Sequence, residues 1–267
     1  MSKNSQSLDY VLNIVHVEGN VKNFFTKRKK LNSLMSYRGQ SEHLPFANQT
    51  LKWFSTDNEK TFNYHLRMNY DRLDDLAWTI KRFDYTFNSL GFRCEEIKDS
   101  EPSIVFLGGS EVIGTGMPIK HIFPEIVAKE LKLKCVNIAQ SGASNDTVYR
   151  LASYWLPKLN AKQVVILSPP PYRIEVINAF LDNPIEFYVP EFHGKHQFFK
   201  TWLSCDDNSV LNEEKNRIAI DHICKTNKLK LLRFEDTDFE TLDYGRDLVH
   251  KGIESHAKFA EKILDLL

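Results

Sequence analysis

Residue types that together carry nucleophilic chemistry occur in the second half of the sequence. Ser110 follows the glycine pair Gly108 and Gly109, and Asp247 lies three positions before His250. A serine hydroxyl is a weak nucleophile at neutral pH, and it needs a base within hydrogen-bond reach that a third group orients. With His250 as the base and Asp247 on its other ring nitrogen, the set predicts acyl transfer through a covalent acyl-enzyme.

Such chemistry also needs donors for the negative charge that develops on the carbonyl oxygen. The segment 137–146, Asn-Ile-Ala-Gln-Ser-Gly-Ala-Ser-Asn-Asp, is small and polar and contains a glycine. We expect the backbone N–H groups of Ser110 and Gly142 to serve as oxyanion donors. One donor of this kind lowers a reaction barrier by about 3–4 kcal/mol.

The elements that must position these residues are predicted by an alternation of strand-like and helix-like segments. Short apolar runs that stop at glycine or proline are typical of strands buried on both faces. The predicted strands are 103–107, 134–138, 163–167 and 229–234. Apolar residues at helical spacing predict helices over 122–131, 147–159, 212–226 and 253–267. This alternation predicts an α/β fold, a three-layer α/β/α sandwich with a mostly parallel sheet.

The predicted sheet brings the candidate residues together. Ligands of such sheets bind at the carboxyl ends of the strands. Ser110 follows the first predicted strand, the segment 137–146 follows the second, and the pair Asp247 and His250 precedes the last helix. We therefore expect all of them at one edge of the sheet.

The N-terminal part is less regular. Residues 10–17 are compatible with a strand, residues 59–90 have helix-like spacing, and 27–30 is a run of Lys and Arg. Such a run is either a nucleic-acid patch or, more often, a solvated loop. We predict an N-terminal extension over 1–100 that packs on an α/β domain over 101–267.

Composition excludes several function classes. Lys+Arg and Asp+Glu both number 35, so the formal net charge is zero and no nucleic-acid partner is expected. The four cysteines form no CxxC pair, which argues against a zinc site or a disulfide framework, and no metal or cofactor is expected. The absence of a signal peptide or a long apolar run predicts a soluble, cytoplasmic protein with no membrane partner. The oligomeric state stays open.

Three segments resemble the sequence blocks of the SGNH (GDSL-like) hydrolase superfamily. The segment 106–110, Phe-Leu-Gly-Gly-Ser, resembles the first block, in which the serine follows a strand. The segment 137–142 resembles the second, whose glycine supplies an oxyanion donor, and 247–250 resembles the final Asp-x-x-His pair. Upstream, 85–93 resembles a lead-in seen in some members. Over about 103–267, the resemblance implies a serine esterase for a small-molecule or carbohydrate ester.

The sequence also departs from the superfamily pattern. The usual Gly-Asp-Ser is here Gly-Gly-Ser. The third block, Gly-x-Asn-Asp, places an oxyanion-donating Asn after the third strand, but this chain has Ser-Pro-Pro-Pro-Tyr-Arg at 168–173. Ser168, Arg173 or Asn145 are alternative replacements for that donor.

Competing interpretations remain open at this point. The same fold can carry a non-catalytic binding module or an acyltransferase. The glycines of 109–116 have P-loop-like spacing without the lysine, which allows a nucleotide-site hypothesis.

Asp247 could simply cap the last helix, and His256 could face solvent or core. His193 and His196 flank a glycine but lack a matching metal-ligand run. The aromatic segment 187–202 is either a substrate wall or a satellite core.

Overall fold

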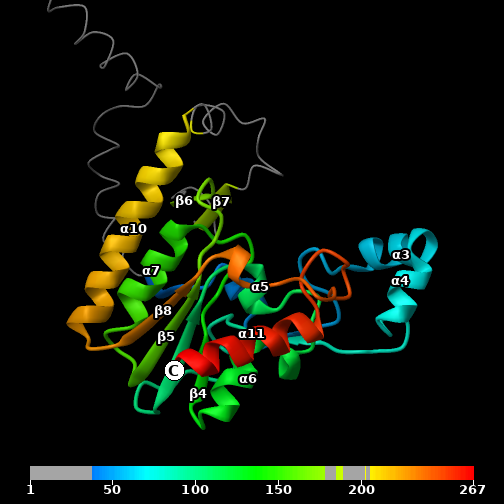
Figure 1. Cartoon of the computed structure of the whole chain (residues 1–267), viewed down its shortest axis with the longest axis horizontal. Coiled ribbons are helices and arrows are strands. Elements are labelled where there is room, and N and C mark those ends of the chain that lie inside the picture. Colours follow the sequence, from blue (N-terminus) through cyan, green and yellow to red (C-terminus); the bar gives the residue numbers. More distant parts are fainter. Residues whose placement is uncertain (1–37, 178–184, 189–201, 203–204) are drawn as a thin grey trace, which may run out of the picture. The chain divides into compact units, whose positions relative to one another are not determined.

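A four-stranded parallel sheet forms the centre of the fold in this computed structural model, which describes residues 38–177, 185–188, 202 and 205–267 (Figure 1). Residues 39–267 form one unit. The strand order is β4-β3-β5-β8, and every neighbouring pair is parallel. The strands are β3 (Ser103–Leu107), β4 (Lys134–Asn137), β5 (Ala161–Leu167) and β8 (Lys230–Phe234).

Both faces of the sheet are buried, which explains why β3 is apolar at nearly every position. Successive side chains of a strand point to opposite faces. Ile104 and Phe106 belong to one core cluster, whereas Val105 and Leu107 belong to the other. Every residue of β3 is buried. This double burial confirms the inference drawn from the unbroken apolar run.

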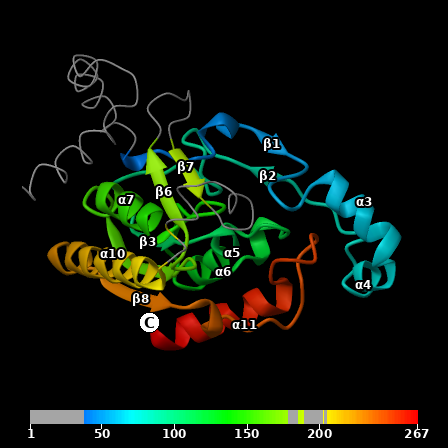
Figure 2. The same ribbon diagram turned by 90° about the horizontal axis from the view of Figure 1, so that it is seen from above.

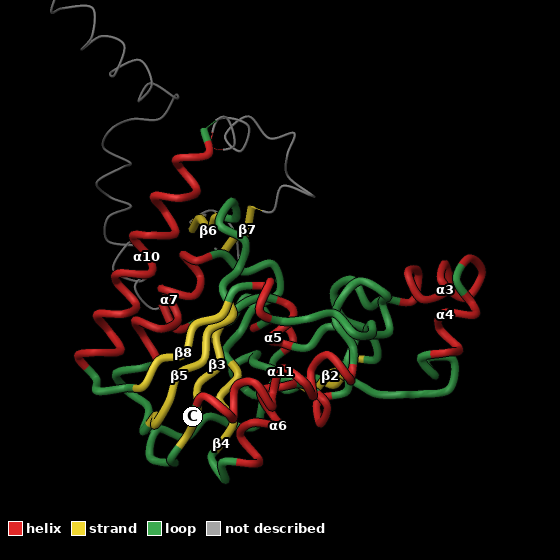
Figure 3. The backbone as a smooth tube through the Cα atoms, in the orientation of Figure 1, coloured by secondary structure: helices red, strands yellow, loops and turns green. Residues whose placement is uncertain are grey.

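Helices cover each face, so the predicted three-layer arrangement is confirmed (Figures 1 and 3). One face carries α6 (Phe123–Glu130) and α11 (Ile253–Leu266), which pack on each other. The opposite face carries α7 (Asn145–Trp155) and α10 (Asp206–Thr226). A capping box between Ser144 and Thr147 fixes the start of α7.

The connections place the carboxyl ends of β3 and β5 at a topological switch point. From β3 the chain runs through α6 to β4, and from β4 it returns through α7 on the other face to β5. The first crossover ends on one side of β3, and the second ends on the other side. Ligands of open α/β sheets bind in the crevice at such a point. Ser110, which follows β3, therefore lies where the fold favours a ligand.

Residues 39–100 contribute to the same cores. Strand β1 (Thr50–Leu51) pairs antiparallel with β2 (Tyr85–Thr86), and helices α3 (Glu59–Met68) and α4 (Tyr70–Asp75) lie between them along the chain (Figure 2). Tyr85 and Phe87 join the core cluster under α6 and α11, and Phe92 joins the other.

Some predicted elements differ from those observed. The helical spacing over 59–90 holds only as far as Asp75, and the chain becomes extended at Tyr85. The short elements are η2 (Leu44–Phe46), α5 (Ser110–Ile113), η3 (Ile119–His121) and η4 (Asp236–Asp238). A further antiparallel pair joins β6 (Ile174–Ile177) to β7 (Ile185–Tyr188). The predicted strand at 10–17, the basic run 27–30 and most of the aromatic segment 187–202 lie outside the described residues.

Candidate active site

The turn after β3 presents Ser110 at the first position of α5. Gly108 has φ +151°, and a Cβ there would lie 2.5 Å from the Leu167 carbonyl oxygen. Only glycine fits this approach of two strand ends. Gly109 precedes the helix in an extended conformation, and α5 ends one turn later at Gly114, which is left-handed. The glycine pair therefore forms the tight turn that places Ser110 at the start of α5.

A continuous chain of hydrogen bonds links Ser110, His250 and Asp247. Ser110 Oγ lies 2.7 Å from His250 Nε2, and His250 Nδ1 lies 2.6 Å from Asp247 Oδ2. Asp247 as a whole residue is 1% exposed. Its other oxygen, Oδ1, accepts the backbone N–H of Val249 and of His250, each at 3.1 Å. Both oxygens of the carboxylate are thus held in place.

A further donor reaches the same carboxylate from residues that sequence analysis could not interpret. The Thr56 hydroxyl donates to Asp247 Oδ2 at 2.6 Å, and it lies 3.5 Å from His250 Nδ1. Thr56 stands in the turn between β1 and α3, 191 positions before Asp247 along the chain. A lone threonine in a polar turn carries no sequence signal for such a contact.

The electrostatics of the pair suit a histidine that gains a proton during a reaction. Burial alone would raise the pKa of Asp247, but hydrogen bonds from His250 and Thr56 outweigh it and hold the pKa below its ordinary value. Burial alone would lower the pKa of His250, but the hydrogen bond and charge of Asp247 raise it above its ordinary value of 6.5. Asp247 therefore stays ionised and stabilises an imidazolium at His250.

A buried ion pair anchors the segment that carries Asp247. The Arg246 guanidinium donates to both oxygens of Asp57 at 2.8–3.1 Å and lies between the rings of Trp53 and Phe83, 4.3 and 4.0 Å from their centroids. Tyr85 donates its hydroxyl to the same carboxylate. A bidentate pair of this kind fixes geometry as well as charge. Side chains from residues 53–85 thus hold Arg246 in place. Arg246 directly precedes Asp247, the candidate orienting group.

A second buried arginine holds the nucleophile turn. Arg93 donates to the carbonyl oxygens of Ile113, Gly114 and Met117, at 2.9, 2.6 and 2.6 Å. These carbonyls end α5 and the turn after it, where helical partners are missing. Arg93 is the last residue of the segment 85–93 that resembles the superfamily lead-in, so this segment has a structural role in fixing α5.

The candidate oxyanion donors lie on loops that meet the nucleophile turn. The loop after β4 packs beside it, because the Gln140 N–H donates to the Gly108 carbonyl at 3.1 Å. In that loop Gly142 is left-handed, with φ +75°. Asn145 is buried and donates from Nδ2 to the Pro169 carbonyl at 3.3 Å, so its side chain reaches the end of β5. An amide group has a second N–H to offer.

The other proposed replacements differ from Asn145. The Ser168 hydroxyl donates to Glu235 at 3.0 Å, so its single O–H already has an acceptor. Arg173 lines the hollow beside Ser110, which has a volume of about 250 Å³. Glu111 also lines that hollow, and burial raises the pKa of its carboxyl. Apolar walls come from Leu167, Pro169, Pro170 and Val249.

Two competing interpretations of the motifs are wrong. Asp247 does not cap the last helix, because Gly252 is the N-cap of α11 and the carboxylate of Asp243 accepts its first amides. The glycine run 109–116 does not form an open phosphate loop. Residues 112–117 are buried, and the Gly116 N–H donates to the Tyr85 hydroxyl.

Within the part of the chain that the structure describes, the remaining histidines do not join the triad-like set. His256 lies on α11, faces the protein core and is fully buried. Its Nδ1 accepts the Phe123 N–H at 3.1 Å. Burial lowers its pKa to about 3. His193 and His196 lie outside the described residues. Within the described ranges, no group of three or more His, Cys, Asp or Glu side chains gathers to hold a metal ion.

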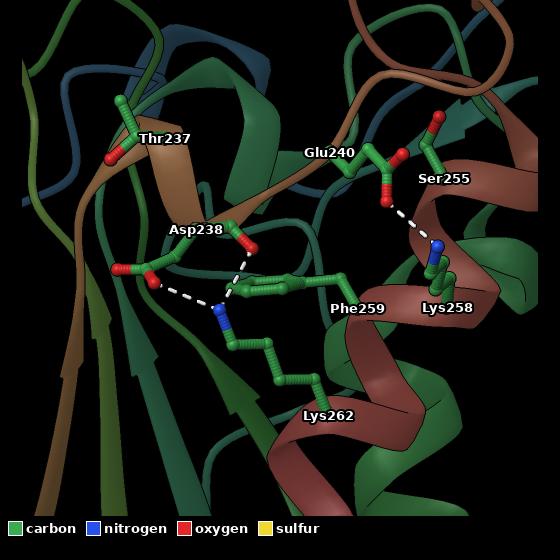
Figure 4. A pocket seen from close by; sticks show the side chains of 7 residues that line it. All are labelled: Thr237, Asp238, Glu240, Ser255, Lys258, Phe259 and Lys262. Carbon is green, nitrogen blue, oxygen red and sulfur yellow. Dashed lines mark hydrogen bonds and ion pairs between the residues drawn. The ribbon is translucent and has the colours of Figure 1, made fainter.

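A separate hollow lies between η4 and α11 and is shown in Figure 4. Lys258 pairs with Glu240 at 2.7 Å and Lys262 with Asp238 at 2.8 Å. Because these surface charges satisfy one another across the hollow, they offer no group for nucleophilic chemistry. Among the described residues, no helix has the length and apolar character needed to cross a bilayer.

Comparison with known proteins finds one family model and several solved structures that are similar to this chain. A family of domains of unknown function, DUF6473, matches residues 68–168, and no curated protein matches the chain. Solved structures match at low sequence identity. A protein assigned to the G-D-S-L lipolytic family from Desulfitobacterium hafniense DCB-2 is 13% identical with a TM-score of 0.33, over 62% of this chain and 99% of that one.

Two carbohydrate esterases are also similar. An acetyl xylan esterase (Est2A) from Butyrivibrio proteoclasticus is 12% identical over 70% of this chain and 67% of that one, with a TM-score of 0.36. A family two carbohydrate esterase from Clostridium thermocellum is 17% identical over 64% of each chain, with a TM-score of 0.33. The chain thus resembles GDSL/SGNH proteins, and at these TM-scores any assignment of chemistry depends on the geometry of the site itself.

Proposed function

We propose that this protein is a serine hydrolase that cleaves a carboxylic ester through an acyl-enzyme. The observation that carries the proposal is the hydrogen-bond chain from Ser110 Oγ through His250 to Asp247, with distances of 2.7 and 2.6 Å. This arrangement matches the nucleophile, base and orienting group that acyl transfer requires. The parallel sheet places it at the carboxyl end of β3, where α/β enzymes bind ligands.

In the first step, Ser110 Oγ attacks the ester carbonyl carbon while His250 Nε2 takes the hydroxyl proton. Asp247 holds Nδ1–H and stabilises the imidazolium. The tetrahedral intermediate places its oxygen against the N–H groups of Ser110 and Gly142 and the free amide N–H of Asn145. His250 then returns the proton to the leaving alcohol as the carbon–oxygen bond breaks, which leaves an acyl ester on Ser110.

In the second step, water takes the place of the alcohol. His250 accepts a proton from the water as it attacks the acyl carbon, and it returns that proton to Ser110 Oγ as the acid leaves. The enzyme is regenerated without any oxidant or cofactor. Transfer to another alcohol uses the same steps with that alcohol as the acceptor, so water and alcohol compete for one intermediate.

The hollow beside Ser110 suits a small ester group. Its volume of about 250 Å³ and its walls of Leu167, Pro169 and Val249 fit a short acyl chain. A small-molecule or O-acylated carbohydrate ester is therefore the substrate class that we propose.

Turnover of p-nitrophenyl acetate and butyrate tests the proposal. We expect hydrolysis by the wild type and none by Ser110→Ala, which should retain the wild-type Tm. A fluorophosphonate probe should label the wild type and leave Ser110→Ala unlabelled. Labelling of both proteins would place the nucleophile elsewhere. Absence of both turnover and labelling in a folded wild type would favour a binding module on the same fold.

A further inference from the structure

Glu111 is a carboxylate beside the nucleophile that the proposed mechanism does not use. It directly follows Ser110 in α5, and it lines the hollow that Ser110 and His250 also line. Its side chain is only 20% exposed. A charged group in such a place is costly unless donors or opposite charges compensate it. The partners of Glu111 therefore indicate its role.

The Glu111 carboxylate is tied to the residue that follows the proposed base. Its two oxygens accept the backbone N–H of Lys251, at 3.4 and 3.2 Å. The Lys251 ammonium lies 3.8 Å from Glu111 Oε1 and 2.6 Å from Asp236 Oδ1. Because Ser110 also bonds to His250, two adjacent residues of the nucleophile turn contact two adjacent residues of the segment that carries the base. This double contact fixes that segment against Ser110.

The same partners favour the ionised form of Glu111. Donated hydrogen bonds and a nearby cation stabilise a carboxylate over the neutral acid. Burial raises the pKa of Glu111, whereas the charges of His250 and Lys251 oppose this rise. The coupling also acts on the base. Burial lowers the pKa of His250, whereas Asp247 and then Glu111 raise it.

Other titratable or charged groups face these two residues or line the same hollow. They are Asp247 and Lys251 on the segment of the base, Asp236 in η4, Arg173 after β5 and His256 on α11. Asp236 is 73% exposed, so solvent screens its charge. His256 is neutral near pH 7, because burial lowers its pKa to about 3. The effect of Glu111 on His250 exceeds the opposing effect of Lys251.

From these contacts, we infer that Glu111 is a positioning residue for the proposed base, which holds the segment of His250 against Ser110 and stabilises the positive charge that His250 gains. The inference rests on the proposed esterase function of Ser110. When His250 Nε2 takes the Ser110 proton, Asp247 stabilises the imidazolium through Nδ1, and the charge of Glu111 adds to that stabilisation. The acyl-transfer steps themselves are unchanged.

Glu111→Gln separates the charge of this residue from its hydrogen bonds. Glutamine keeps a side-chain oxygen for the Lys251 N–H, so the variant should fold with a Tm near that of the wild type. NMR titration of the histidine rings measures the pKa of His250, and His250→Ala identifies its signal among the nine histidines. We expect Glu111→Gln to lower this pKa by about 0.5 or more, because a nearby opposite charge is lost. The acid limb of kcat/KM should move to lower pH by the same amount.

Glu240→Gln is the matched control for the loss of one carboxylate. Glu240 also pairs with a lysine, Lys258 at 2.7 Å, but both side chains are more than half exposed. This variant should leave the pKa of His250 and the acid limb unchanged. An unshifted His250 in Glu111→Gln would overturn the charge role of Glu111. A lower Tm without that shift would assign it a structural role only.

Glu111→Leu tests the tether to the Lys251 N–H, because leucine has a similar size but accepts no hydrogen bond. Below its Tm, we expect this variant to have a kcat at least about tenfold below that of Glu111→Gln, since misplacement of a catalytic group slows the reaction. The loss should fall on kcat more than on KM. Equal kcat values in the two variants would overturn the tether.

The NMR titration needs no substrate, so it separates this inference from the proposed function. If the wild type lacks turnover but Glu111→Gln lowers the pKa of His250, the esterase is refuted and the coupling of the two residues is retained. Turnover by the wild type together with an unshifted His250 in Glu111→Gln would refute the charge role of Glu111 alone.

Discussion

Thr56 and His250 share one carboxylate oxygen, because the Thr56 hydroxyl and His250 Nδ1 both lie 2.6 Å from Asp247 Oδ2. The two donors approach from segments far apart in the sequence. A donor that is fixed in the folded chain restricts where the carboxylate can turn and therefore where it holds the imidazole. Thr56 is thus a positioning residue for the proposed base.

We expect Thr56→Val to lower kcat about tenfold with little change in KM. A hydrogen bond to a charged group typically contributes about 1.5–3 kcal/mol. We expect its loss to raise the activation free energy by part of that amount. The Asp247 carboxylate would then bind His250 more strongly, so the acid limb of the pH–rate profile should move to higher pH. Thr56→Ser retains the hydroxyl and should restore both. A fall in Tm with an unchanged pH profile would assign Thr56 a structural role only.

His250 and His256 form a matched pair for a second prediction. His250→Ala should reduce kcat by at least about a thousandfold, because the base is lost. His256→Ala removes the acceptor of the Phe123 N–H and a ring in the core. It should cost about 2–4 kcal/mol of unfolding free energy and leave kcat nearly unchanged below the new Tm. Loss of activity in folded His256→Ala would contradict the assignment of the base.

Much of the sheet was predictable because double burial leaves a simple pattern. The run 103–107 coincides with β3, and the other predicted strands are confirmed with ends shifted by one or two residues. Helix ends were harder to predict from the sequence. Helix α10 begins at Asp206, six residues before the predicted start, because its first turns are polar and largely exposed and show no apolar period.

The residues of the candidate site also divide into those that the sequence indicates and those that it does not. Ser110, Asp247 and His250 were named because each follows a strand or precedes the last helix, where fold and chemistry agree. Thr56 and Asp57 were not, because their contacts depend on how residues 39–100 pack. The helical spacing over 59–90 predicted too long a helical region for a related reason. Asn69 leaves the helical conformation between α3 and α4, and tertiary packing of Tyr85 imposes a strand.

The pH dependence of kcat/KM follows from the direction of the His250 shift. Because the pKa of His250 is raised above 6.5, the neutral base predominates only above that raised value. Activity should therefore rise with pH through a single limb whose midpoint exceeds 6.5, and then level off. Asp247→Asn should move the limb to lower pH and reduce kcat by about four orders of magnitude. A flat profile between about pH 5 and 8 would exclude a histidine base.

Asn145 and Ser168 test which side chain replaces the third-block asparagine. Ser168 directly follows β5 and donates its hydroxyl to Glu235, whereas Asn145, the first residue of α7, keeps one amide N–H beyond its bond to the Pro169 carbonyl. If Asn145 donates to the oxyanion, Asn145→Ala should lower kcat about 100- to 1,000-fold with a small effect on KM. Ser168→Ala should stay within about threefold of the wild type. A large loss confined to Arg173→Ala would instead transfer the donor role to the guanidinium that lines the hollow.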